Sequence, residues 1–206
     1  MINLLEWLLQ VPDYRFEPLF ETDENLQVKT RITKSERKLL KRSEKMEEAV
    51  ISIVEKGLSD EEWEGLFYIM GKGELNRFRP IYVGKAEKKG TKNAISENIR
   101  NIRTDKSKFA RWGDGTAYHI GGLSQVLFQF KSYQPPTKKY TRWANALFSS
   151  FDPPILKEPI YLYVAPWYST LRGPSGFICS LPAVEKEIIS LASEQFKSTL
   201  LNVDGV

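Results

Sequence analysis

The chain has 206 residues, of which 41% are hydrophobic and 27% are charged, and its formal net charge is +4 with a pI near 9.0. This composition is typical of a globular protein with a sizeable core, and the small positive charge favours a polyanionic partner where basic residues cluster. Cys179 is the single cysteine, which excludes an internal disulfide and a multi-cysteine metal site and indicates a cytoplasmic protein. Because no apolar run is long enough to span a bilayer, we expect no membrane partner.

Residues 1–60 are predicted to form a helical extension. Met1–Val11 has apolar residues at helical spacing and lacks the basic start of a signal peptide, so an amphipathic helix is expected. Thr33 or Ser35 can cap a long helix that runs to about Gly57. One flank of this helix is strongly basic, and it is either solvated or in contact with phosphates: Lys34, Arg37, Lys38, Lys41, Arg42 and Lys45.

The next segment is predicted to be a hairpin followed by a helix. Ser59–Glu62 resembles a second helix start, with acidic residues in its first turn. The pattern then changes to period two, which predicts antiparallel strands at Leu66–Met70 and Pro80–Val83, with Gly84 ending the second strand. A helix is expected from about Ala94 to Thr104.

Residues 107–158 are predicted to be an insertion before a third strand. That strand is expected at Ile160–Ala165, and a shorter one within the insertion at Val126–Phe130. Ser180 then caps a helix that runs to about Phe196, with a proline in its first turn.

This order of elements predicts an α+β (mixed α/β) fold, with a small three-stranded β-sheet flanked by helices. The helical extension of residues 1–60 and a domain of residues 61–206 are expected to form one compact unit.

The predicted hairpin resembles the paired signature of the GIY-YIG endonucleases. Gly65–Met70 reads Gly-Leu-Phe-Tyr-Ile-Met, and Pro80–Ala86 reads Pro-Ile-Tyr-Val-Gly-Lys-Ala, which is similar to the form in small type II restriction enzymes of this family. The resemblance covers residues 65–104 well and residues 160–202 more loosely. It implies a Mg²⁺-dependent, site-specific endonuclease for double-stranded DNA, with Mn²⁺ as a substitute metal and with 5′-phosphate and 3′-hydroxyl products.

The resemblance implies a catalytic tyrosine on each strand of the hairpin. Tyr82 stands at the second position, where its phenol can relay a proton beside a cation such as Lys85, which itself contacts phosphate or is simply solvated. At the first position, Phe67 stands where tyrosine is expected and Tyr68 follows it. A slip of one residue turns a side chain to the opposite face. Tyr68 is therefore either re-aimed by a bulge or an ordinary strand aromatic.

An arginine on the next helix, a glutamate on a later helix and then an asparagine are also implied. Arg103 lies nearer the predicted buried face than Arg100, so it is preferred for neutralising the scissile phosphate. Glu185 lies within the apolar stripe of its helix and Glu187 outside it, which makes Glu185 the candidate Mg²⁺ ligand. The alternative for Glu185 is an early-helix acid favoured by the helix dipole. Asn202 is matched to the asparagine, at a longer spacing than the family pattern.

His119, the single histidine, is either structural or swings into the site from the insertion. The insertion mixes cations with aromatic residues, and it either contacts DNA or packs its own aromatic side chains. The candidate DNA contacts are Arg111, Lys131, Lys138, Lys139 and Arg142.

A single active site of this family cuts one strand, so a homodimer on double-stranded DNA is expected. Two alternatives stay open. One is a catalytically impaired GIY-YIG-derived DNA-binding protein, and the other is a structure-specific repair or recombination nuclease.

Overall fold

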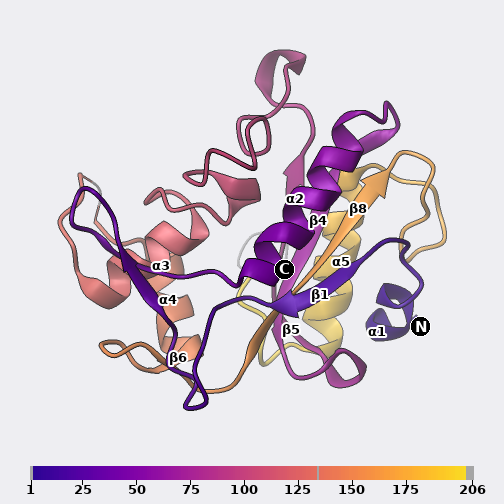
Figure 1. Ribbon diagram of the computed structural model, residues 1–206. Helices are drawn as coiled ribbons and strands as arrows, with labels where there is room; N and C mark the ends of the chain where they lie inside the picture. Colours follow the sequence, from indigo (N-terminus) through magenta and orange to yellow (C-terminus); the bar gives the residue numbers. More distant parts are fainter. Residues whose placement is uncertain (1, 134, 203–206) are drawn as a thin grey trace.

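The computed structural model describes residues 2–133 and 135–202, and it has an α+β fold, as expected (Figure 1). Within these residues the helices are α1 (Leu4–Leu8), α2 (Glu44–Leu58), α3 (His119–Phe128), α4 (Lys138–Leu147) and α5 (Leu181–Gln195). The strands are β1 (Arg15–Pro18), β2 (Thr30–Ile32), β3 (Lys38–Leu40), β4 (Trp63–Lys72), β5 (Arg79–Glu87), β6 (Phe148–Ser150), β7 (Ile155–Leu156) and β8 (Ile160–Tyr168).

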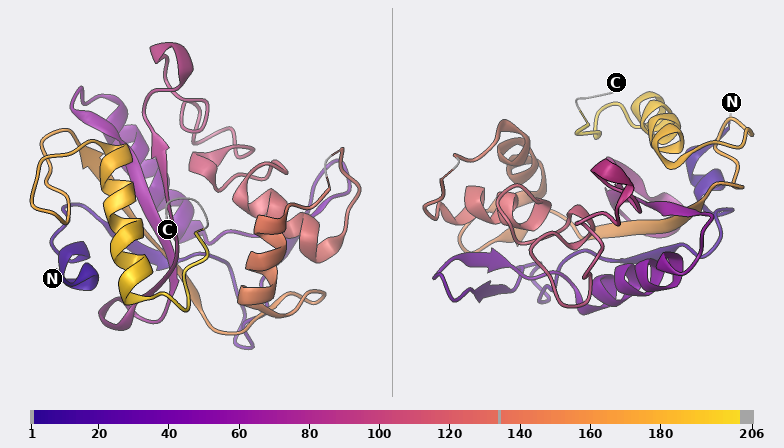
Figure 2. Two further views of the ribbon diagram at one scale, coloured as in Figure 1. Left: turned by 180° about the vertical axis from the view of Figure 1, so that it is seen from behind. Right: turned by 90° about the horizontal axis from the view of Figure 1, so that it is seen from above.

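The main sheet has four strands in the order β1-β8-β4-β5, and every neighbouring pair is antiparallel. The predicted three strands correspond to β4, β5 and β8, and β1 from the N-terminal region adds the fourth. Helices α2 and α5 lie on opposite faces of this sheet (Figure 2). Strand β5 forms one edge of the sheet and β1 forms the other.

Each face of the sheet has its own apolar core. On one face, α2 contributes Met46, Val50 and Val54 to a core that also contains Leu66 and Met70 of β4. Alternate residues of β4 point to the other face, where α1 and α5 cover them: Phe67 and Ile69 pack with Leu4, Trp7, Val184 and Ile188. The period-two pattern of β4 therefore separates two hydrophobic layers.

A side lobe, composed of β2, β3, α3, α4, β6 and β7, lies beside the edge strand β5 (Figure 1). In this lobe the amide of Leu40 donates to Ser124 Oγ at 3.0 Å, which joins the β2–β3 hairpin to α3. Helix α3 also packs on α4 at Gly122, where an added Cβ would lie 2.1 Å from the ring of Tyr140. A glycine is therefore required at this helix crossing.

The predicted helical extension of residues 1–60 is wrong in three places, and the region also contains β1, β2 and β3. The long helix begins at Glu44, with Ser43 as its cap, because Thr30–Leu40 forms the β2–β3 hairpin instead. The basic flank is therefore divided between this hairpin and α2. The first helix is limited to Leu4–Leu8, and Ser59–Glu62 is a turn into β4 in which Asp60 Oδ1 accepts from the amide of Glu62.

Three further predictions are corrected around the insertion. Gly84 lies inside β5, which continues to Glu87. Residues 94–104 form a bend and successive turns instead of the predicted helix, and Ile99 and Ile102 are buried whereas Ile95 is exposed. Val126–Phe130 is no strand, because residues up to Phe128 belong to α3 and Gln129 ends that helix in a left-handed conformation.

A buried ion network joins the β2–β3 hairpin to the loop before α3. Arg42 is 5% exposed, and its Nη1 donates to Asp114 Oδ1 at 2.9 Å and to the carbonyl of Trp112 at 2.7 Å. Its Nε donates to Glu47 Oε1 at 2.8 Å. Arg31 also pairs with Asp114. Because Trp112 belongs to the loop that precedes α3, the network holds this loop in place.

We expect Arg42→Met to lower the free energy of unfolding by about 3–5 kcal/mol, because it leaves Asp114 buried without its main partner. Urea unfolding measures this loss. Lys41→Met is the matched control, since Lys41 pairs with the exposed Glu44 and its replacement should change stability little. Equal losses in both variants would contradict this role for Arg42.

Candidate functional site

The two motif tyrosines lie on the same face of the hairpin. Tyr68 is paired with Gly84 and Met70 with Tyr82, and residues two apart on β4 share a face. The register shift in this pair of strands comes after Met70, so it does not separate the tyrosines. Their ring centroids are 6.4 Å apart. Phe67 points to the opposite face, which leaves Tyr68 as the strand tyrosine of the site.

Gly84 allows the ring of Tyr68 to cross the edge strand. An added Cβ at Gly84 would lie 2.6 Å from the Tyr68 ring and hydroxyl, so any larger residue would displace the ring. The hydroxyl of Tyr68 thereby reaches the side lobe. Gly84 therefore has a packing role inside β5, which continues to Glu87.

His119 links Tyr68 to Tyr140 of α4. Its Nε2 lies 2.8 Å from the Tyr68 hydroxyl and its Nδ1 lies 3.1 Å from the Tyr140 hydroxyl. Burial lowers the pKa of His119 well below its ordinary value, and the charges of Lys139 and Arg111 lower it further. A neutral imidazole donates from one nitrogen and accepts at the other, so the three groups form a directional hydrogen-bond chain.

Tyr68 itself is a poor proton acceptor. Burial raises its pKa well above the ordinary value, and the nearby Tyr82 and Glu185 raise it further against the opposing charge of Arg111. The phenol therefore stays protonated, which suits a positioning role in the chain to His119.

Lys139 of α4 reaches Tyr82 from the side lobe. Its Nζ donates to the Tyr82 hydroxyl at 3.1 Å. The same ammonium lies 4.4 Å from the centroid of the Tyr82 ring and 4.9 Å from that of Trp143, which is a cation–π arrangement. Since Tyr82 is only half-buried, its hydroxyl is the more accessible of the two motif phenols.

Glu185 lies at the same edge of the sheet but comes from α5. Its Oε2 is 3.7 Å from Lys85 Nζ, which also pairs with Glu87 at 2.8 Å. Burial raises the pKa of Glu185, and Lys85 opposes this shift. Helix α5 covers the face opposite the tyrosines, and Lys85 points to that face because it lies directly across from Phe67.

Asn202 holds the free edge of β5 between Tyr82 and Gly84. Its Oδ1 accepts from the amide of Val83 at 2.9 Å, and its Nδ2 donates to the carbonyl of Val83 at 2.9 Å. These two bonds mimic a neighbouring strand. Asn202 is therefore placed to position the strand that carries Tyr82.

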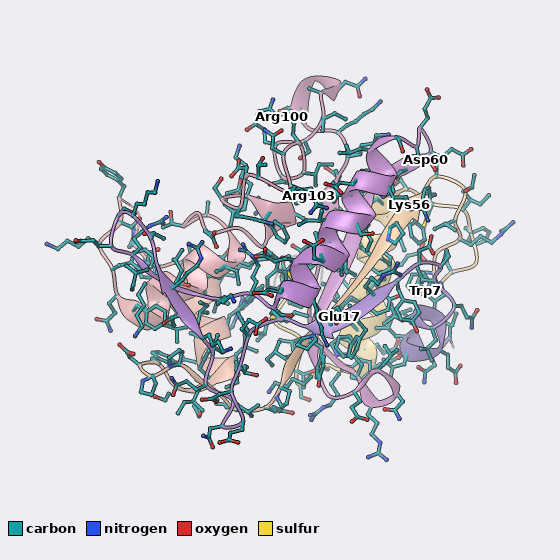
Figure 3. All side chains as sticks on the ribbon, in the orientation of Figure 1. Trp7, Glu17, Lys56, Asp60, Arg100 and Arg103 are labelled. Atoms are coloured by element: carbon teal, nitrogen blue, oxygen red, sulfur yellow. The ribbon has the colours of Figure 1, made fainter. Side chains whose placement is uncertain are left out.

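The structure does not link the predicted arginines to the tyrosines. Arg103 lies beside α2, where it pairs with Glu55 at 2.8 Å and Glu48 at 3.6 Å, and Arg100 pairs with Glu97 (Figure 3). The reason is that residues 94–104 form turns, so the helical-wheel argument for Arg103 does not apply.

The other predicted residues lie around the site at different places. Glu187 accepts from the amide and hydroxyl of Ser175 in the loop before α5. Lys138 and Arg142 line a shallow hollow on α4, and Lys131 lines another hollow next to Tyr133.

Tyr140 and Trp143 are site residues that were not predicted from the sequence. Both project from α4 into the cluster, where Trp143 contacts the Tyr82 ring with centroids 4.6 Å apart. Thr137 caps α4, and the spacing of Tyr140, Trp143 and Leu147 after it is typical of the buried face of a helix. That pattern could have placed these aromatic residues on one helical face.

The carboxylates at this edge fit a weakly coordinated Mg²⁺. Magnesium keeps several waters and takes one or two carboxylates together with substrate phosphate. Glu185, with Glu87 beside the same ammonium, offers such a donor set. A closed protein site does not fit, since no group of three or more His, Cys, Asp or Glu side chains suitable for a metal occurs among the residues described.

Comparison of the chain with protein-family models, with curated proteins and with solved structures gives no match. In the part of the chain that the structure describes, no helix has the length and apolarity needed to cross a membrane.

The lowered pKa of His119 predicts acid-sensitive stability. The unfolded chain binds a proton near pH 6.5 while the folded chain does not, so the free energy of unfolding should fall below that pH, by at most about 1.4 kcal/mol per pH unit. Chemical unfolding from about pH 7.5 to 5.5 measures the slope. His119→Gln should flatten it. An unchanged slope in this variant would contradict the buried neutral state of His119.

Proposed function

We propose that this chain is a Mg²⁺-dependent, site-specific endonuclease that hydrolyses double-stranded DNA to 5′-phosphate and 3′-hydroxyl ends. The observation that carries the proposal is the convergence of Tyr68, Tyr82, His119 and Lys139 at one edge of the sheet. The half-buried Glu185 lies next to Lys85 of the edge strand β5, on its other face. The resemblance of the hairpin to GIY-YIG endonucleases supports the same reaction class.

In this proposal Tyr82 gives its phenolic proton to solvent and, as the phenolate, takes the proton of the attacking water. Lys139 Nζ donates to the Tyr82 oxygen, so a positive charge lies beside the negative charge of the phenolate. Tyr68 and His119 stay neutral and position the neighbouring rings. Asn202 fixes the strand that carries Tyr82 through its two bonds to Val83.

Glu185 would hold the Mg²⁺, and Lys85 would turn from this carboxylate toward the phosphate. The bound ion would neutralise charge on the scissile phosphate and on the leaving oxygen. Lys85 lies between two carboxylates, so a cation that binds Glu185 competes with its ammonium. In this proposal a phosphate-binding lysine would lie next to the metal ligand.

The remaining cations would hold the DNA backbone. Lys131, Lys138 and Arg142 are exposed, and Lys138 and Arg142 belong to α4, the helix that also carries Lys139. One such site cuts one strand, so cleavage of both strands requires a second copy of the chain on the DNA.

Plasmid and phage DNA incubated with Mg²⁺ should give discrete fragments, and EDTA should abolish them. Tyr82→Phe and Glu185→Gln should each lower the cleavage rate by about 100-fold or more, because each removes a group that acts on the reacting atoms. Glu187→Gln is the matched control on the same helix and should cut at close to the wild-type rate.

Metal-independent DNA binding without cleavage of any substrate would contradict the proposal and favour a catalytically impaired DNA-binding protein. Cleavage of branched but not of intact duplexes would replace site-specific cutting with a structure-specific repair or recombination role.

A further inference from the structure

A hollow of about 330 Å³ adjoins the tyrosine site within the side lobe. The side chains that give it its chemistry are Arg111, Thr116, Thr137, Lys139 and Tyr140. Two of them are cations and three carry hydroxyl groups, and among the residues that the structure describes no carboxylate lines the hollow. This is the chemistry of an anion site, because oxyanions accept hydrogen bonds from all of these groups.

Arg111 is the cation available to a ligand here. Its guanidinium carbon lies 5.1 Å from the centroid of the Tyr118 ring, which leaves the hydrogen-bonding edge of the group unused by that contact. Over residues 2–133 and 135–202, no carboxylate forms an ion pair with Arg111. A bidentate donor of this kind suits phosphate.

The backbone is strained to bring Arg111 to the hollow. Phe109, Ala110 and Arg111 have φ angles of 34°, 48° and 76°, and none of them is glycine. Each such residue costs about 1–3 kcal/mol, so the surrounding structure has to compensate. Phe109 and Ala110 are fully buried, the amide of Ala110 donates to the carbonyl of Asn98 at 2.7 Å, and Arg42 holds the next carbonyl, that of Trp112.

The hollow is joined to the proposed catalytic groups. Tyr140 lines it and also holds His119 Nδ1, while Lys139 lines it and also holds the Tyr82 hydroxyl. On its other side, Thr116 is shared with a second hollow of about 510 Å³ that Arg37, Lys131 and Tyr133 line. Basic groups therefore continue in one direction away from Tyr82.

We propose that this hollow binds a backbone phosphate next to the scissile one, with Arg111 as its main ligand and Lys139 shared between the two phosphates. The identity of the ligand as nucleic acid rests on the proposed function. Arg111 then fixes the register of the DNA strand relative to Tyr82. The sequence predicted only a general DNA contact for this residue.

The test is the salt dependence of duplex binding in EDTA, where no cleavage occurs. Each phosphate contact contributes close to one unit to the slope of log K against log [salt]. Arg111→Met should therefore lower the slope by about 1, which makes binding roughly 3.5-fold less sensitive to a change from 50 to 200 mM salt. Arg111→Lys should keep most of the slope, since it keeps the charge.

Arg100→Met is the matched control, because Arg100 is an exposed arginine paired with Glu97 and it should leave the slope unchanged. Lys139 approaches the hollow from α4, so Lys139→Met should also lower the slope. This second variant tests the hollow if Arg111→Met disturbs the strained loop. Wild-type slopes in both Arg111→Met and Lys139→Met, or an equal fall in Arg100→Met, would overturn the assignment.

The two proposals fail separately. If the salt slopes of the variants change as expected but no Mg²⁺-dependent cleavage occurs, the nuclease proposal is overturned and the phosphate site stands. If cleavage occurs as expected but the salt slopes do not change, the phosphate site is overturned and the nuclease proposal stands.

Discussion

The hydrogen bond between Tyr68 and His119 is the interaction on which the site depends. Tyr68 belongs to the sheet and His119 to the side lobe, and their 2.8 Å contact is buried. It forms only because Gly84 lets the Tyr68 ring cross the edge strand. Breaking it would leave a buried polar group unpaired, at a cost of about 1–3 kcal/mol. The contact therefore fixes where the lobe, with Lys139 and Tyr140, stands relative to Tyr82.

The ion network of Arg42 supports the same arrangement from the other side. It ties the β2–β3 hairpin and the start of α2 to Asp114 and Trp112, and so to the strained residues that carry Arg111. Removing one partner of such a network leaves a buried charge unpaired, so the network favours the geometry in which every charge is paired. In this chain it specifies the position of the loop between the sheet edge and α3.

Local patterns predicted those parts of the fold in which the hydrophobic period agrees with tertiary packing, although the Ser180 side chain makes no capping hydrogen bond. The β4–β5 hairpin, β8 and the helix after Ser180 are of this kind, and Tyr82 and Glu185 lie on them. The remaining elements depend on partners far along the chain. Arg42 is buried in a strand-to-helix turn because it pairs with Asp114, which lies 72 residues further along the chain. Gly122 lies in a helix at the point where the ring of Tyr140 packs against it. Arg103 was misplaced because its segment forms turns.

A crystal structure with duplex DNA and Mn²⁺ tests the central claim most directly, because the anomalous signal of Mn²⁺ locates the metal independently of the protein. The account predicts one Mn²⁺ in contact with a Glu185 carboxylate oxygen and a phosphate oxygen, with that phosphate beside Tyr82 and Lys139. A duplex bound on another surface, or a metal with no contact to Glu185, would contradict it.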